Sequence, residues 1–219
     1  MSALYLAVNE ATRIRERWVK ALLVVWGPFA HYRRAMVKEF SRRKMDKVLN
    51  SPNVTAHRLT DNGLIPNNPR LPLLIYHNAI RLRDDDPASA VERILAGNKW
   101  GASWRNGIYP YHHYHSTAHE VLVVTRGSAR VQLGGEKGIT QKIHPGDVIL
   151  IPAGVGHKNL GASNDLEIVG AYPKGQDWDM NCGKRTERPR ADQNIARVRL
   201  PETDPIYGAD GPLLDYWRS

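Results

Sequence analysis

The chain has 219 residues, a formal net charge of +9 and a single cysteine, Cys182. One cysteine excludes an internal disulfide and a thiolate metal cluster, and it agrees with a reducing compartment, so we expect a cytoplasmic protein. The longest apolar run near the N-terminus, Ala21 to Trp26, is far shorter than the ~20 residues of a membrane span, and no basic residue precedes the stretch from Leu4 to Val8, which argues against a secretory signal.

Residues 1–50 are predicted to form a basic helical extension. They hold 11 Lys and Arg residues against 4 acidic ones, so most of the net charge lies here. Apolar residues recur at helical spacing in residues 2–26, and a second helix is expected over residues 30–49 after the break at Gly27 and Pro28. A solvated appendage is the first interpretation of such a segment.

Two functional interpretations of residues 1–50 stay open beside this one. Basic residues favour nonspecific, salt-sensitive contact with nucleic acid or with an anionic membrane. An organelle-targeting helix fits less well, because Glu10 and Glu16 depart from the acid-poor composition of transit peptides.

Residues 51–219 are predicted to form one domain of short strands. Apolar and β-branched runs bounded by turn residues predict strands at residues 57–60, 71–77, 79–83, 121–125, 148–151, 166–173 and 197–200. Residues 128–135 and 140–145 indicate a hairpin that turns at Gly134 and Gly135. No internal repeat is visible, which favours one barrel over two.

One short helix is expected before the histidine-rich stretch described next. Asp86 can cap its N-terminus, Pro87 suits its first position, and an apolar face runs to Gly97, where the helix ends. This helix would pack outside the strands.

Four of the nine histidines lie between residues 112 and 119. Residues 108–115 are tolerant of strand structure, and alternate side chains of a strand leave the same face, so His113 and His115 point to one side and can reach one ion. Glu120 begins the next strand after a bend over residues 116–118, where a buried carboxylate requires a partner.

An alternative register places His119 in the cluster instead of Glu120. His115 and His119 have equal strand parity, so an unbroken strand would turn Glu120 away. With the bend, His119 becomes a neighbour of the ligands or faces solvent.

A second segment, residues 146–161, supplies a further histidine. Residues 148–151 form a buried strand that ends at Pro152, and Gly154 and Gly156 permit a tight turn that delivers His157 into the next strand. His144 lies in a closing loop and is expected to be exposed.

Two tyrosines precede the histidines with the same parity. Tyr109 and Tyr111 would face the same cavity as His113 and His115 if the strand has no bulge. They are candidates for binding substrate, although tyrosines in sheets more often serve packing.

These two segments resemble the two signature motifs of the cupin superfamily. The resemblance rests on the glycines, histidines, glutamate and proline at motif spacing: Gly107, His113, His115, Glu120 and Gly127, then Gly146, Pro152, Gly154 and His157. One position departs, because Gly161 stands where the motif has asparagine, and Asn159 lies two residues earlier. More narrowly, residues 54–217 look like the bacterial YjlB-like cupins.

The resemblance implies an all-β fold, a double-stranded β-helix (cupin jelly-roll barrel), with a divalent metal in its mouth. The implied ligands are His113, His115, Glu120 and His157. A homodimer is expected on the same grounds, because jelly rolls of this kind commonly pair through sheet edges.

Three imidazoles and one carboxylate suit Fe, Mn, Ni, Co or Zn better than Mg or Ca, which prefer oxygen ligands. We therefore expect a metal-dependent enzyme that acts on a small polar molecule, with dioxygenase-like or isomerase-like chemistry. The alternative is a noncatalytic metal- or ligand-binding module that uses the basic segment 1–50 for interaction, since a fold does not by itself confer a reaction.

Overall fold

The computed structural model describes residues 48–83 and 85–218, and the helices expected within residues 2–47 lie outside this range. The described strands are β1 (Val54–His57), β2 (Leu73–Tyr76), β3 (Trp100–Asn106), β4 (Glu120–Arg126), β5 (Ala129–Leu133), β6 (Ile139–Ile143), β7 (Val148–Ile151), β8 (His157–Ala162) and β9 (Glu167–Pro173). The helices are α3 (Pro87–Gly97), α4 (Arg190–Arg197) and α5 (Pro212–Arg218), with a 3₁₀ turn at Arg185–Glu187.

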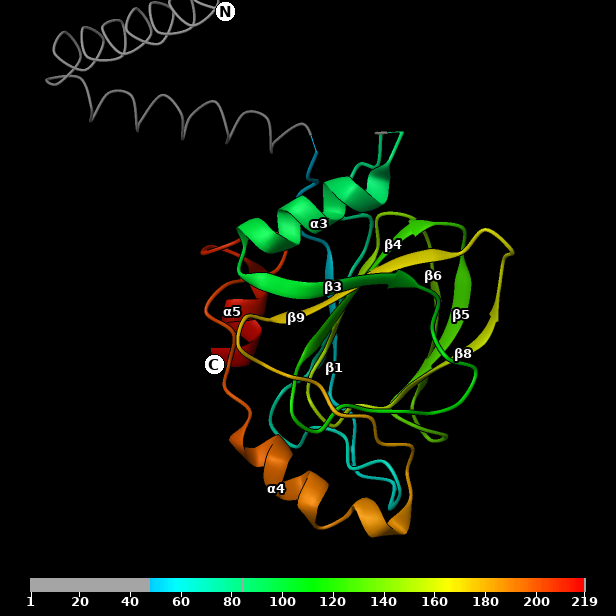
Figure 1. Ribbon diagram of the computed structural model, residues 1–219, viewed down its shortest axis with the longest axis vertical. Coiled ribbons are helices and arrows are strands. Elements are labelled where there is room, and N and C mark those ends of the chain that lie inside the picture. The colour runs from blue at the N-terminus through cyan, green and yellow to red at the C-terminus, as the bar shows by residue number, and fades with distance from the viewer. Residues whose placement is uncertain (1–47, 84, 219) are drawn as a thin grey trace, which may run out of the picture. The chain divides into compact units, whose positions relative to one another are not determined.

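The strands form two antiparallel sheets. The larger has the order β1-β2-β7-β4-β9-β3, and the smaller has the order β6-β5-β8. Figure 1 shows the smaller sheet to the right of the larger one. In the described chain the sheets are hydrogen-bonded as two separate units, so the barrel is not closed, but the expected all-β class is confirmed.

The central strands of the larger sheet are buried on both faces. In β4, Val121 and Val123 pack on one side of the sheet, whereas Leu122 and Val124 pack on the other. Strands β2 and β7 alternate in the same way, which explains their unbroken apolar sequences.

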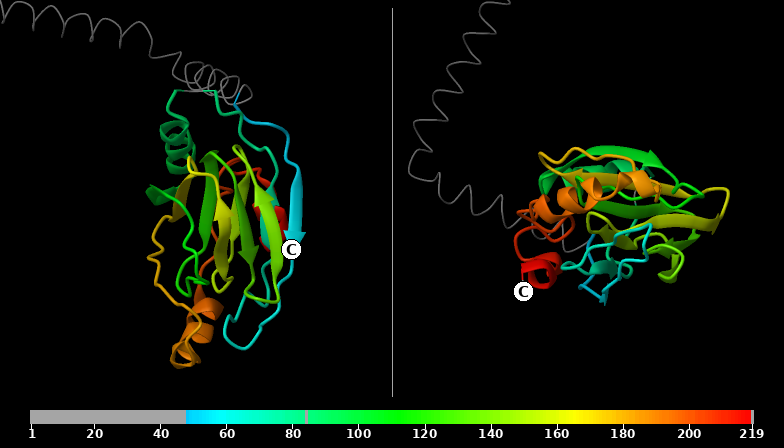
Figure 2. Two further views of the ribbon diagram at one scale, coloured as in Figure 1. Left: turned by 90° about the vertical axis from the view of Figure 1, so that its right-hand side faces the viewer. Right: turned by 90° about the horizontal axis from the view of Figure 1, so that it is seen from below.

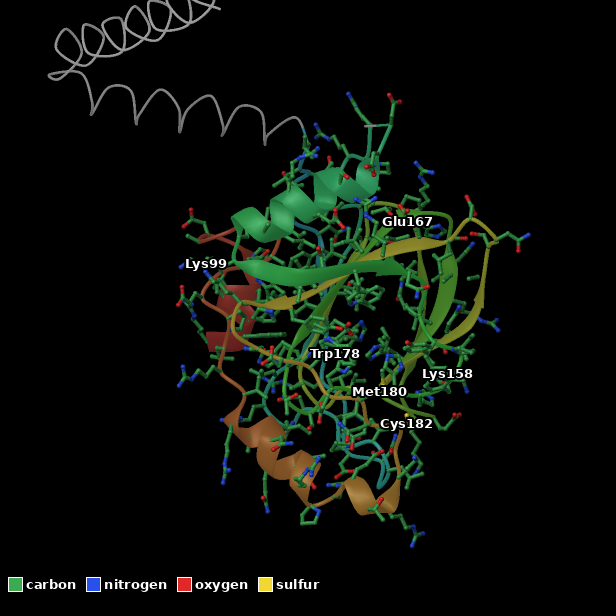
Figure 3. The ribbon with its side chains drawn as sticks, viewed as in Figure 1. Lys99, Lys158, Glu167, Trp178, Met180 and Cys182 are labelled. Carbon is green, nitrogen blue, oxygen red and sulfur yellow. The ribbon has the colours of Figure 1, made fainter. Side chains whose placement is uncertain are left out.

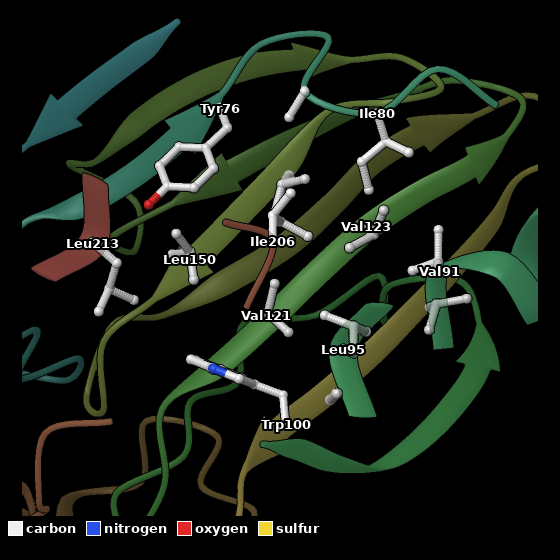
Figure 4. Close-up of a cluster of buried hydrophobic side chains, with 14 of the residues drawn as sticks. Tyr76, Ile80, Val91, Leu95, Trp100, Val121, Val123, Leu150, Ile206 and Leu213 are labelled. Carbon is white, nitrogen blue, oxygen red and sulfur yellow. The ribbon is translucent and has the colours of Figure 1, made fainter. Parts of the chain in front are cut away.

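One face of the larger sheet is covered by helices α3 and α5. Figure 4 shows the resulting cluster, in which Leu95 of α3 and Leu213 of α5 lie over the strand residues Val121 and Leu150. The other face packs against the smaller sheet through Leu122, Leu133 and other apolar side chains. The helices α3 and α4 lie at opposite ends of the strands (Figures 1 and 2).

Several predicted elements are confirmed. Helix α3 begins as expected, because the Asp86 carboxylate accepts a hydrogen bond from the backbone N of Ser89 at 3.1 Å. Strands β5 and β6 form the expected hairpin, and Gly134 and Gly135 in its turn have φ of +91° and +82°. Strand β7 covers the predicted residues 148–151.

Other predicted elements are wrong. The strand expected at residues 197–200 is absent, because α4 extends to Arg197 and residues 198–200 form neither helix nor strand. The first strand is shifted from residues 57–60 to Val54–His57. Residues 48–49, expected to end a helix, lie against the domain instead, where Leu49 forms an isolated bridge with Ile80. The strand expected over residues 79–83 is reduced to this isolated bridge at Ile80. Strand β3 has no counterpart among the predictions.

None of the helices in the described part of the chain has the length and apolar character that a bilayer crossing requires.

Candidate metal centre

His113 and His157 are brought together by the backbone. The segment before the bend pairs with the start of β8, where the N of His113 donates to the carbonyl O of His157 at 3.2 Å and the N of His157 donates to the carbonyl O of His113 at 2.9 Å. Residues paired in this way carry their side chains to the same side, and the two imidazole centroids are 4.0 Å apart. Residues 44 positions apart in the chain therefore meet.

The turn before His157 depends on glycine at two positions. Gly154 has φ +93°, and a Cβ there would lie 2.6 Å from the carbonyl O of Asn67. At Gly156 a Cβ would lie 2.8 Å from Cγ2 of Ile65. The close approach of the backbone to these neighbours explains why both residues lack a side chain.

His115 completes a cluster of three imidazoles. One ring nitrogen from each of His113, His115 and His157 lies within 4.8 Å of the other two. All three side chains are buried, with at most 5% exposed. Neutral imidazoles at this separation can share one transition-metal ion.

Glu120 adjoins this cluster from the first residue of β4. Its Oε2 lies 3.4 Å from Nε2 of His115 and 3.3 Å from Nε2 of His157, and the residue is only 2% exposed. This oxygen has no hydrogen-bond partner among the described residues. A buried carboxylate oxygen without a donor is costly, and a bound cation would offset that cost.

The electrostatics of the cluster keep one ring neutral and the carboxylate charged. Burial, and to a smaller extent the neighbouring His157, lower the pKa of His113 to about 3. Burial opposes the charge on Glu120, yet the adjacent His115 and His157 outweigh burial and hold its pKa well below the usual range. Burial also opposes protonation of His115, but Glu120 outweighs it and raises the pKa of that ring.

His119 is kept out of the cluster by the bend at Ser116 and Thr117. Its Nδ1 accepts a hydrogen bond from the backbone N of Ala153 at 3.0 Å, and its ring packs 4.7 Å from the ring of Trp217. His119 does not face solvent, which was one of the two places expected for it, because the residue is only 1% exposed. His144, expected to be exposed, is exposed.

The two tyrosines differ in position. Residues 108–112 do not form the expected strand, so Tyr109 and Tyr111 need not face the same side as His113. Tyr109 lines the cavity in front of the cluster, whereas Tyr111 is not among the lining residues and stacks on Tyr109 with centroids 5.0 Å apart. At the position where the cupin motif has asparagine, the backbone N of Gly161 donates a hydrogen bond to Oδ1 of Asn159 at 2.8 Å.

The loop after β9, residues 174–183, is attached to the bend. The Asp179 carboxylate accepts hydrogen bonds from the backbone N and the Oγ of Ser116, and the carbonyl O of Asp177 accepts from Oγ1 of Thr117 at 2.7 Å. Asn181 pairs with Tyr114 through two backbone hydrogen bonds of 2.9 and 3.0 Å. These anchors are alternate residues, as in an extended segment.

The intervening residues of this loop, Trp178 and Met180, line the cavity. Trp178 stacks on Tyr172 of β9, with centroids 6.0 Å apart and an interplanar angle of 21°. Figure 3 shows the labelled Trp178 and Met180 within the ring of strands. No site role was predicted for this loop from the sequence. The signal that could have indicated one is the alternation of polar anchors with large apolar residues.

The cavity that holds the cluster has a volume of about 390 Å³. The three histidines and Glu120 lie on its wall together with Trp104, Tyr172 and apolar side chains. The Tyr172 hydroxyl accepts a hydrogen bond from Nε1 of Trp104 at 3.1 Å. Burial raises the pKa of Tyr172, and Glu120 raises it further, so this hydroxyl keeps its proton.

Comparison with known proteins agrees with the motif spacing. A family model described as "Cupin" matches residues 104–173. The "uncharacterized protein YjlB" of Bacillus subtilis is 46% identical over 157 residues, which are 72% of this chain and 92% of the relative.

Solved structures are related more distantly. A dTDP-4-dehydrorhamnose 3,5-epimerase from Elizabethkingia anophelis matches with a TM-score of 0.35 and 8% identity, over 58% of this chain and 77% of the other. Procruciferin from Brassica napus, an 11S globulin, matches with a TM-score of 0.30 and 16% identity, over 59% of this chain and 27% of its own. Likenesses of this strength say nothing about a reaction.

Proposed function

Because the chain belongs to the cupin superfamily, in the family of the YjlB protein of Bacillus subtilis, we propose that it is a metal-dependent enzyme that acts on a small molecule. The observation that carries the proposal is the group of three buried histidine nitrogens within 4.8 Å of one another on the wall of a cavity. Dioxygenase-like or isomerase-like chemistry fits such a site best.

The residues present fit a metal ion. His113, His115 and His157 would hold it through neutral imidazole nitrogens, and Glu120 would add a carboxylate oxygen that has no other hydrogen-bond partner in the described chain. When bound, an ion of Mn, Fe, Co, Ni or Zn supplies a Lewis acid or a redox centre.

The surrounding residues would position the ligands and a substrate. The carbonyl O of Asp179 accepts a hydrogen bond from Nδ1 of His115, which turns Nε2 of that ring toward Glu120. The protonated hydroxyl of Tyr172 can donate a hydrogen bond to a substrate oxygen in the cavity. Trp178 and Met180 would displace water from the mouth of the site.

The test is the metal content of protein purified without chelator, measured by elemental analysis. We expect about one ion per chain in the parent and a sharp loss in His113→Ala and His157→Ala. His144→Ala is the matched control, because this exposed histidine lies outside the cluster. A His113 or His157 variant that keeps full occupancy would count against that ligand.

The alternative function is a noncatalytic metal- or ligand-binding module that contacts a partner through the basic residues 1–50. The concentration of Lys and Arg in that segment favours it. The two functions separate in two assays. Turnover of small molecules by the metal-loaded chain, followed by oxygen consumption and by NMR for isomerisation, supports the enzyme. Salt-sensitive binding of nucleic acid or anionic vesicles without any turnover supports the module.

A homodimer in the cytoplasm remains our expectation. The strands β1 and β3 are the edges of the larger sheet in the described chain, and edge strands are where sheets of two copies can pair. Light scattering coupled to gel filtration would give the mass of the particle, and a monomeric mass at micromolar concentration would contradict the dimer.

A further inference from the structure

The cavity in front of the histidine cluster has an aromatic wall. Rings of Trp104, Tyr109, Tyr172 and Trp178 line it, so the polar cluster faces a largely apolar space. Flat apolar surfaces of this kind are suited to stacking against another ring.

Two of the apolar side chains in this cavity remain exposed to solvent. Trp178 is 48% exposed and Met180 is 40% exposed, although the loop that carries them is fixed at Asp179 and Asn181. Exposed apolar surface on an anchored loop favours a ligand that covers it, because burial of that area is favourable.

Among its described lining residues, the cavity offers an anionic ligand no cationic side chain that is free of a protein partner. Arg105 is the one Lys or Arg among its described lining residues, and its guanidinium donates to Glu92 at 2.7 and 3.0 Å and to Ser89 at 2.8 Å. The side chains of Lys99 and Lys158 lie toward the periphery in Figure 3. Phosphates and substrates with several carboxylates would therefore lack partners at this site.

We propose, building on the function proposed above, that the substrate is a flat mono- or bicyclic aromatic molecule with a single anionic or chelating oxygen group. The ring of this molecule lies against Trp178, and its oxygen group points to the histidine cluster. The ring centroids of Trp178 and His115 are 5.5 Å apart. The volume of about 390 Å³ accommodates such a molecule, since a benzene ring fits in ~150 Å³.

The experiment is a calorimetric titration of the full-length chain loaded with Mn²⁺, using three matched probes. The probes are 2-naphthoate, its saturated counterpart decahydro-2-naphthoate, and naphthalene-2,6-dicarboxylate. We expect 2-naphthoate to bind about tenfold more tightly than either of the others, because only it combines a flat ring with a single carboxylate.

Variants locate the binding. Trp178→Ala should weaken 2-naphthoate about tenfold, whereas Tyr216→Ala, a change at an exposed aromatic residue outside the cavity lining, should leave it unchanged. Equal affinity for the three probes, tighter binding of the dicarboxylate, absence of binding at millimolar concentration, or an unaffected Trp178→Ala variant would each overturn the proposal.

The outcomes also separate this proposal from the metal site. A chain that takes up no Mn²⁺ but binds 2-naphthoate in a manner that depends on Trp178 would remove the metal-dependent function and leave the substrate class standing. A chain that takes up Mn²⁺ but shows no preference among the probes would remove the proposed substrate class and leave the metal site standing.

Discussion

The carbonyl oxygen of Asp179 accepts a hydrogen bond from Nδ1 of His115, a residue 64 positions earlier in the chain. A carbonyl can only accept, so Nδ1 carries the proton, and in the neutral ring that binds a metal Nε2 has a lone pair on the side of Glu120. The loop after β9 thereby sets the tautomer of a ring in the candidate metal centre.

Loss of the Asp179 side chain should weaken metal binding. Its carboxylate accepts hydrogen bonds from Ser116, Thr117 and Asn181, which hold the loop and the bend together. We expect Asp179→Ala to lower metal affinity about 10- to 100-fold, the range typical of residues that orient metal ligands. Competition with a fluorescent chelator measures this. Asp177→Ala is the control, since that exposed side chain lies in the same loop, and an equal effect of both variants would refute the orienting role.

Acid should destabilise the fold through His119. Burial lowers the pKa of His119 to about 3, whereas the unfolded chain has a value of ~6.5. Between these values the unfolded chain binds a proton that the folded chain excludes. The stabilising contribution is thus complete above about pH 6.5 and is lost as pH falls toward 3, at up to about 1.4 kcal/mol per pH unit.

Urea denaturation in the presence of chelator measures this dependence without interference from metal release. His119→Gln should reduce the slope but not abolish it, because the amide oxygen can still accept from Ala153 and does not titrate, whereas the pKa of His113 is also lowered to about 3. His144→Gln should leave the parent slope unchanged. An identical slope in all three proteins would show that His119 does not exclude the proton.

The hydrogen bonds to the buried Asp204 carboxylate should contribute to stability. Its carboxylate is fully buried and accepts hydrogen bonds from the Tyr76 hydroxyl at 2.7 Å and from the backbone N of Ile206, Tyr207 and Leu213. Tyr76→Phe removes a charge-assisted bond, so we expect the free energy of unfolding to fall by about 1.5–3 kcal/mol. Tyr207→Phe, which removes a neutral bond to Asn50, should cost about 1 kcal/mol or less. Equal losses in urea denaturation would argue against a charged Asp204.

Truncation locates the start of the folded unit. We expect deletion of residues 1–47 and deletion of residues 1–50 both to leave a cooperatively melting domain. The longer deletion removes backbone hydrogen bonds between Val48 and Arg81 and between Asn50 and Ala79, so it should be less stable by about 1–3 kcal/mol. Chemical denaturation of the two proteins gives the difference, and indistinguishable stabilities would mean that these pairings contribute nothing.

The parts of the site that could be predicted from the sequence are those set by short-range spacing. The common orientation of His113 and His115 follows from alternation before a bend, and the turn before His157 follows from its glycines, which are both local patterns. Strands β7 and β9 and the capped helix α3 were predicted for the same reason. The meeting of His157 with the other two histidines was implied by the resemblance to the cupin motifs.

The parts that could not be predicted depend on distant contacts. Tyr111 leaves the cavity because residues 108–112 are not a strand, which no local propensity indicates. The β-branched Val198 favours a strand, but residues 190–197 form α4, which buries Ala191 and Ile195, four residues apart. The place of Trp178 follows from the bonds of Asp179 to a segment 63 residues away.

Alternate residues of the loop after β9 have different roles. Residues 177, 179 and 181 fasten it to the bend by hydrogen bonds, whereas the side chains of Trp178 and Met180 line the cavity, where Trp178 also packs against Tyr172 and His115. A substitution at Met180 can therefore change which molecules enter while these hydrogen bonds remain, whereas a substitution at Trp178 also removes a ring that packs against His115.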